Sequence, residues 1–180
     1  MSTISGGIPL FTPRSGGSGG GGGGSALLWS EQANSPILDV ENNFEVYLFT
    51  SGLTQELYTA LRVPSSYSAG NPIKLLVEAY SPDTSGTILL RAQSTLIRAE
   101  VDEMSSTTNQ RTTTNSAITM SADNDNEPQK IELDIASSSG QINSVAIAAG
   151  DLIKVRLYRD TDTATSDVRF IKLSGEPTFS

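Results

Sequence analysis

The stretch Ile73-Lys74-Leu75-Leu76-Val77-Glu78-Ala79-Tyr80 decides the fold class of this chain. Apolar side chains stand at every second position from Ile73 to Ala79, and charged side chains stand at two of the positions between them. Alternate side chains of a β-strand point to opposite faces, so this segment buries one face and exposes the other. Similar alternation runs through residues 44–49, 57–63, 130–135 and 153–158. The pattern predicts one-sided strands of antiparallel sheets.

Clusters of Gly, Pro, Asn, Asp and Ser separate these runs, as expected between short strands. Further strands are expected at Ala26–Trp29, Thr87–Leu90, Ala117–Ser121 and Val168–Leu173. Residues 92–104 are ambiguous, because their apolar positions could line a helical face; we expect a strand through Arg91 or beyond, followed by a short helix or loop. With about eight or nine strands, the chain is predicted to be all-β, a jelly-roll-like antiparallel β-sandwich.

Residues 1–25 have a different composition from the rest of the chain. A glycine tract with two serines, residues 16–25, follows a short apolar patch, and Arg14 carries the only charge before Glu31. We predict an extended anchoring arm and Gly/Ser tether at 1–25, followed by a β-sandwich domain at 26–180. A tail without a partner is the alternative. The residues expected to anchor the arm are Ile8, Pro9, Leu10, Phe11 and Arg14.

The composition excludes several classes of function. The formal net charge is −8, and Arg14 lies in the arm, so the remaining residues carry −9 and would repel a phosphate backbone. Cysteine and histidine are both absent, which removes nucleophile–histidine pairs and nearly all zinc sites. No apolar run approaches the roughly 20 residues that cross a bilayer, and the first residues lack signal-peptide features. We expect no nucleic-acid partner, no membrane insertion and synthesis in the cytoplasm.

Carboxylates are the remaining candidates for chemistry. Paired-carboxylate glycoside hydrolysis is compatible with a β-sandwich, but nothing singles out two of the acids. The acids considered are Glu78, Glu100, Asp102, Glu103 and Asp134. We therefore expect a protein that is not an enzyme and has no cofactor.

Two acidic segments raise the question of calcium. In Asp123-Asn124-Asp125-Asn126-Glu127, alternate acids could chelate Ca²⁺, but Pro128 stands where a calcium loop needs glycine. Asp160, Asp162 and Asp167 form the second acidic segment. We expect the first to be a solvated turn and predict no metal site.

The last predicted strand is apolar on both faces, which favours an oligomer interface. The expected interface residues are Trp29, Val168, Phe170, Ile171 and Leu173. For the single tryptophan, packing in the core or at an interface is favoured over a glycan-binding platform.

Three stretches carry a resemblance to a known class of proteins: Leu61–Tyr67, Ala149–Asp160 and Asp167–Phe170. Together they resemble the β-sandwich domains of virion proteins of tailed bacteriophages, including capsid decoration proteins, head fibres and tail-fibre tips. The last two stretches are expected to form a closing hairpin. The resemblance implies a homo-oligomer, commonly a trimer in that class, and an arm that grips the particle.

The sequence therefore predicts a virion structural protein, anchored through its arm to a major capsid or tail protein and decorating or stabilising the capsid. The alternative is a tail-fibre or receptor-binding module that contacts a host glycan. In that alternative, the contacts are expected from the loops Ser105–Ser116 and Asp123–Glu127.

Overall fold

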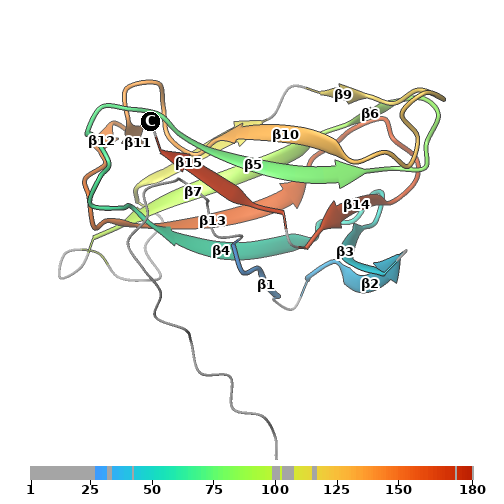
Figure 1. The fold of residues 1–180 in the computed structure, drawn as a ribbon, viewed down its shortest axis with the longest axis horizontal. Coiled ribbons are helices and arrows are strands. Elements are labelled where there is room, and N and C mark those ends of the chain that lie inside the picture. Colours follow the sequence, from blue (N-terminus) through green and yellow to red (C-terminus); the bar gives the residue numbers. More distant parts are fainter. Residues whose placement is uncertain are drawn as a thin grey trace, which may run out of the picture.

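A computed structural model of the chain describes residues 27–31, 34–41, 43–98, 102, 108–114, 117–172 and 174–179. The predicted arm, residues 1–25, lies outside these residues. The described part consists of two antiparallel sheets packed face to face, with small hairpins toward the ends (Figure 1). None of it forms a helix long and apolar enough to cross a membrane.

The first sheet has five strands in the spatial order β1-β4-β13-β7-β8. They are β1 (Ser30–Glu31), β4 (Glu56–Arg62), β13 (Leu152–Arg159), β7 (Leu90–Ile97) and β8 (Gln110–Thr114). Strand β13 is central, since it pairs with β4 along one edge and with β7 along the other. Its alternation of Ile153, Val155 and Leu157 with polar residues places these three apolar side chains in the core.

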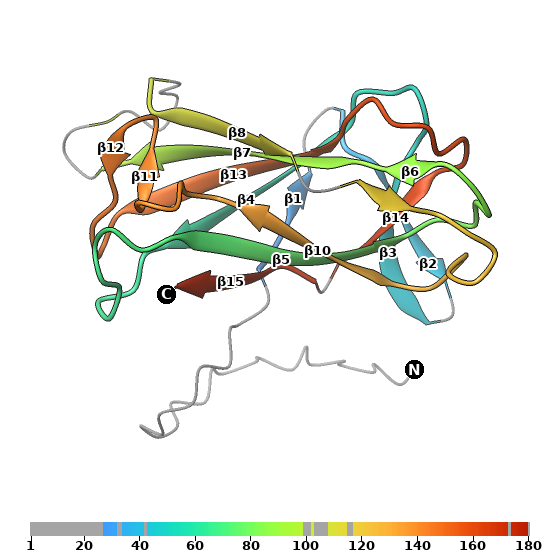
Figure 2. The same cartoon turned by 90° about the horizontal axis from the view of Figure 1, so that it is seen from above.

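The second sheet has six strands, with β10-β5-β14-β3-β2 in order and β15 also paired to β5. They are β10 (Gln129–Asp134), β5 (Ile73–Tyr80), β14 (Val168–Ile171), β3 (Phe44–Phe49), β2 (Ile37–Glu41) and β15 (Glu176–Phe179). Two further two-stranded ladders join β6 (Thr87–Ile88) to β9 (Ile118–Thr119) and β11 (Gln141–Ile142) to β12 (Val145–Ala146). Figure 2 shows both sheets from above, with β11 and β12 at one end.

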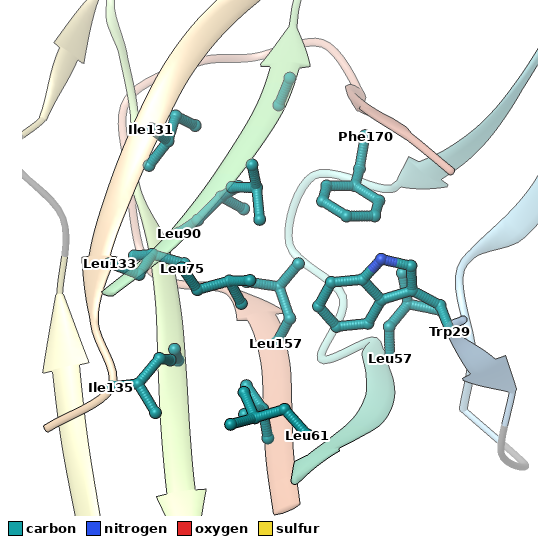
Figure 3. Packing of buried hydrophobic residues seen from close by; sticks show 14 of the residues in the cluster. Trp29, Leu57, Leu61, Leu75, Leu90, Ile131, Leu133, Ile135, Leu157 and Phe170 are labelled. Atoms are coloured by element: carbon teal, nitrogen blue, oxygen red, sulfur yellow. The ribbon is translucent and has the colours of Figure 1, made fainter. Parts of the chain in front are cut away.

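The core lies between the two sheets and is filled from both sides. The inward side chains of β5 are Ile73, Leu75, Val77 and Ala79, and all four are fully buried. Trp29 packs edge-on against Phe170, with ring centroids 5.1 Å apart (Figure 3). Burying each large apolar side chain contributes about 1.5–3 kcal/mol, so the alternation is the main source of stability.

The predicted fold class, an all-β antiparallel sandwich, is confirmed, but two finer expectations are wrong. The described residues form fifteen strands rather than eight or nine, and the strands that were not expected are β2, β8, β11, β12 and β15. The strand expected through Arg91 or beyond extends to Ile97 as β7, and most of residues 99–107 lie outside the described residues. Finally, β13 and β14 belong to different sheets, so the connection between them crosses the sandwich instead of closing a hairpin.

That crossing is held by a buried arginine. The side chains of Arg159 and Asp162 are each 3% exposed, and Arg159 Nη2 donates to Asp162 Oδ1 at 2.8 Å. The same guanidinium donates to the carbonyl oxygens of Phe49, Ser166 and Ala164. A buried charge with its partners in place is stable, but either charge alone is strongly unfavourable. Arg159 therefore joins the end of one sheet to the start of the other.

Replacing Arg159 with methionine should lower the free energy of unfolding by about 3–5 kcal/mol, because it leaves the Asp162 carboxylate buried without its cation. Lys74→Met is the matched control, since Lys74 forms an exposed ion pair with Glu132 and its loss should cost less than about 1 kcal/mol. Urea unfolding of both variants measures the difference. Equal losses in the two variants would contradict this role of Arg159.

Candidate functional site

A groove of about 620 Å³ lies on the outer face of the six-stranded sheet, where it is bordered by β2, β3, β5 and β14. It is lined by Glu41, Phe44, Val46, Glu78, Tyr80, Asn126, Pro128, Ile171 and Ser174. This volume lies within the range of small-ligand sites, about 300–1,000 Å³. Apolar and aromatic side chains share the groove with carboxylate, amide and hydroxyl groups.

The β2–β3 hairpin brings Glu41 and Phe44 to one side of the groove. These two residues face each other across the ladder, and Asn43 in the turn between them has φ of 70°, a left-handed conformation that asparagine tolerates. The Phe44 ring is 62% exposed, whereas Val46, two residues further along the same face, is fully buried. The hairpin thus presents an aromatic ring to solvent above an apolar floor.

Three polar side chains form a fixed cluster at one end of the groove. Arg169 Nε donates to both carboxylate oxygens of Glu41, at 2.7 and 2.9 Å, and Tyr80 Oη donates to Glu41 Oε2 at 2.8 Å. The guanidinium also lies over the Tyr80 ring, 5.9 Å from its centroid. Because Arg169 and Tyr80 are cross-strand neighbours, the sheet register itself brings them together. The Glu41 carboxylate is therefore neutralised and held in place.

The floor of the groove contains an interruption in the sheet. Strands β14 and β15 both pair with the same edge of β5, and Ser174 lies in the break between them. The backbone N–H of Glu78 donates to Ser174 Oγ at 3.0 Å, so the serine hydroxyl replaces the missing ladder partner. The Ser174 hydroxyl donates in turn to the carbonyl of Ile171 at 2.7 Å. Ser174 is consequently part of the sheet as well as part of the groove.

The connection between β9 and β10 forms the rim of the groove on the side of β5. The backbone N–H of Asn126 donates to the Ser81 carbonyl at 2.9 Å, just after the end of β5. Asn126 has φ of 57°, and its side chain is exposed beside Asp125. An amide with free hydrogen-bonding capacity thus borders the groove.

The structure separates the residues predicted to form an oligomer interface. Trp29, Val168 and Phe170 lie in the core. For Trp29 this is one of the two packing roles expected, whereas for Val168 and Phe170 intramolecular packing replaces the expected interface. Ile171 lines the groove instead, because it faces the opposite side of β14. Leu173 lies outside the described residues, as do all the anchoring residues predicted in the arm.

Of the two segments expected to contact a glycan, one reaches the groove. Asn126, in the Asp123–Glu127 segment, borders the groove. The described part of the Ser105–Ser116 segment is mostly β8, which begins near β11 and β12 (Figure 2). A second hollow of about 320 Å³ lies there, and its lining includes Gln110, Arg111 and Asn143 but no aromatic residue. The described residues of Ser105–Ser116 therefore do not line the groove.

The acids considered for catalysis or metal binding are also dispersed. Glu78 lies in the groove, Asp134 faces Lys74 across a ladder, and Asp102 accepts a hydrogen bond from the backbone N–H of Arg98. Glu100 and Glu103 lie outside the described residues. In the second acidic segment, Asp160 and Asp162 pair with Arg91 and Arg159, and Asp167 accepts from the Ser51 N–H. The described part of the chain contains no group of three or more acids that could hold a metal ion.

Sequence reasoning singled out Glu78, Ile171 and, within the Asp123–Glu127 loop, Asn126, but missed the rest of the groove. Phe44 and Tyr80 belong to alternating runs, in which an outward aromatic side chain is a usable signal for a binding face. Glu41 carried no such signal. Its partner Arg169 is 128 positions away in the chain, so only the folded register brings the two together.

Comparison with known proteins adds the following. No protein-family model and no curated protein matches the chain. Among solved structures, the chain is similar to TmCBM61, whose structure was solved in complex with β-1,4-galactotriose. The two sequences are 8% identical, the match covers 87% of this chain and 90% of TmCBM61, and the TM-score is 0.42. The chain is also similar to the CBM22-2 xylan-binding domain of Paenibacillus barcinonensis Xyn10C, with 12% identity, coverage of 82% and 92%, and a TM-score of 0.36. These similarities concern the strand arrangement, so the ligand of the groove must be inferred from its own residues.

Burial, together with the hydrogen bond to Glu41, raises the pKa of Tyr80 to about 12. Since this pKa exceeds the ordinary value near 10, the protonated phenol stabilises the folded state. This contribution of Tyr80 to the stability of the folded state is complete below about pH 10 and is lost as the pH rises through about 12. Glu41→Gln should lower the pKa of Tyr80 by removing the carboxylate charge.

Ultraviolet titration of phenolate absorbance measures this shift, and Tyr80→Phe identifies the contribution of Tyr80. Tyr47 is the internal control, because burial and the charge of Glu31 raise its pKa to about 12 independently of Glu41. A Tyr80 titration unchanged by Glu41→Gln would contradict the described cluster.

Proposed function

We propose that this chain is a carbohydrate-binding β-sandwich module and that the groove beside Phe44 is its binding site. The observation that carries the proposal is the exposed Phe44 ring on the same face as the Glu41 and Glu78 carboxylates. Sugar rings present apolar C–H faces and polar hydroxyl edges. An aromatic ring can pack against the C–H faces, and carboxylate or amide oxygens can accept hydrogen bonds from the hydroxyl groups.

The arrangement within the groove supports binding of an extended chain of sugars. The site is a shallow groove across strand ends rather than an enclosed cavity, and its volume of about 620 Å³ exceeds that of one sugar ring. The Glu41 carboxylate is already engaged by Arg169 and Tyr80, so it serves as a positioned acceptor. We propose binding without turnover, since paired-carboxylate hydrolysis needs two available carboxyl groups and the described residues of the groove provide one, because Arg169 and Tyr80 engage Glu41.

Phe44→Ala should weaken binding of an oligosaccharide at least tenfold while leaving the fold intact, because the ring is mostly exposed. Leu53→Ala is the matched control, since Leu53 is 57% exposed and lies outside the groove. Isothermal titration calorimetry with β-1,4-linked tetraoses of glucose, galactose, mannose and xylose measures the affinities. Equal binding by both variants would place the site elsewhere, and no binding by the unmodified protein would refute the proposal.

The setting of this module on a phage particle is a separate proposal, which rests on the sequence resemblance and the apolar patch Ile8–Phe11. In that setting, the arm holds the domain to a capsid or tail protein, and several arms in an oligomer combine weak contacts. The domain would then either decorate the capsid or present its groove to a host glycan.

Deleting residues 2–15 should abolish association with particles while leaving the sandwich folded. Co-sedimentation of the truncated protein with particles measures this, and circular dichroism checks the fold. Quantitative mass spectrometry against the major capsid protein distinguishes the two locations, because decoration requires many copies and a tail tip only a few. Retained association after truncation would defeat the anchoring role, and absence from purified particles would defeat the virion setting.

A further inference from the structure

The charges around the groove differ in how far they are compensated. Arg169, the cation that neighbours the groove through Glu41, is committed to that carboxylate through two hydrogen bonds and also donates to the Asp167 carbonyl. Lys172, next to Ile171 in the chain, forms an ion pair with Glu45 at 3.0 Å. An anionic ligand would therefore have to displace an existing carboxylate before it could reach either of these cations.

Glu78 is in the opposite situation. Its carboxylate lines the groove and makes no hydrogen bond or ion pair with any side chain that the structure describes. Its cross-strand neighbour on β10 is Lys130, which is exposed and makes no ion pair with it in the described part of the chain. The Glu78 side chain thus presents an acceptor-only group to whatever enters the groove.

Two further acids lie near the margins of the groove. Asp125 is in contact with the exposed Asn126 side chain on the rim. Asp39 belongs to the same outer face of β2 as Glu41, and its negative charge contributes to the raised pKa of Tyr80. Together with the net charge of −8, these positions make the approach to the groove negative.

We infer that the groove selects uncharged sugars over acidic ones and that Glu78 is the residue that determines this preference. The inference rests on the proposed carbohydrate-binding function and specifies its substrate class. Hydroxyl groups of a neutral sugar can donate to the Glu78 carboxylate. A uronic or sialic acid would bring a second carboxylate to the same position, where the repulsion between like charges opposes binding.

The experiment compares β-1,4-linked tetraoses of glucose, galactose and mannose with forms in which their primary alcohols have been oxidised to carboxylates. The unmodified protein should bind at least one neutral tetraose and bind its oxidised form at least tenfold more weakly. Glu78→Gln keeps the shape of the side chain and removes its charge, so it should reduce this preference at least threefold. Glu132→Gln changes the net charge equally, and because Glu132 lies outside the groove it should leave the preference unchanged.

The outcomes separate the inference from the proposed function. Equal binding of neutral and oxidised tetraoses would overturn the inference while leaving a carbohydrate site in place. Equal effects of the two glutamate variants would also overturn it, because the preference would then come from net charge rather than from Glu78. No binding of any neutral tetraose would contradict the proposed function, and the inference would fail with it.

Discussion

The divided edge of β5 is the constraint on which the rest of the structure depends. Strand β5 lies next to β10 on one side, while its other side is shared by β14 and β15, which pair with opposite ends of it. The break between them is closed by Trp29, whose indole N–H donates to the Ser174 carbonyl at 2.9 Å. Gly175 has φ of 122°, and a side chain there would approach the Trp29 ring to 3.1 Å, so glycine is required. One buried tryptophan thereby satisfies the backbone at the point where the sheet is interrupted.

The groove is a consequence of this interruption. An unbroken strand beside β5 would continue the regular outer face, whereas the break places Ser174 beside Glu78 and leaves a hollow between β5 and the β2–β3 hairpin. The register of β14 then sets Arg169 opposite Tyr80, within reach of Glu41 on β2. The packing that completes the core and the geometry that shapes the groove therefore originate in the same segment, residues 168–175.

The sequence was sufficient for the fold class because periodicity is a local property. Strands β5 and β13 alternate over eight residues each, and their apolar positions are the ones buried in the sandwich. It was insufficient where structure depends on distant partners. The interruption at Ser174 needs Trp29 from the other end of the described chain, and an apolar run through residues 168–173 gives no sign that the strand stops. The same limit explains the missed site: an outward aromatic residue was visible in the sequence, but its convergence with Glu41 and Glu78 was not.

The residues of the groove divide into two sets with different consequences for stability and for binding. Ser174, Arg169 and Tyr80 make hydrogen bonds that belong to the sheet, so replacing them would leave groups in the folded protein without partners. Phe44, Glu78 and Asn126 present a ring, a carboxylate and an amide toward the groove, and their side chains carry little of the core packing. Substitutions at Phe44, Glu78 or Asn126 can therefore change what the groove contacts, while the hydrogen bonds of Ser174, Arg169 and Tyr80 preserve its shape. Under the proposed function, this division places specificity on side chains that the fold does not need.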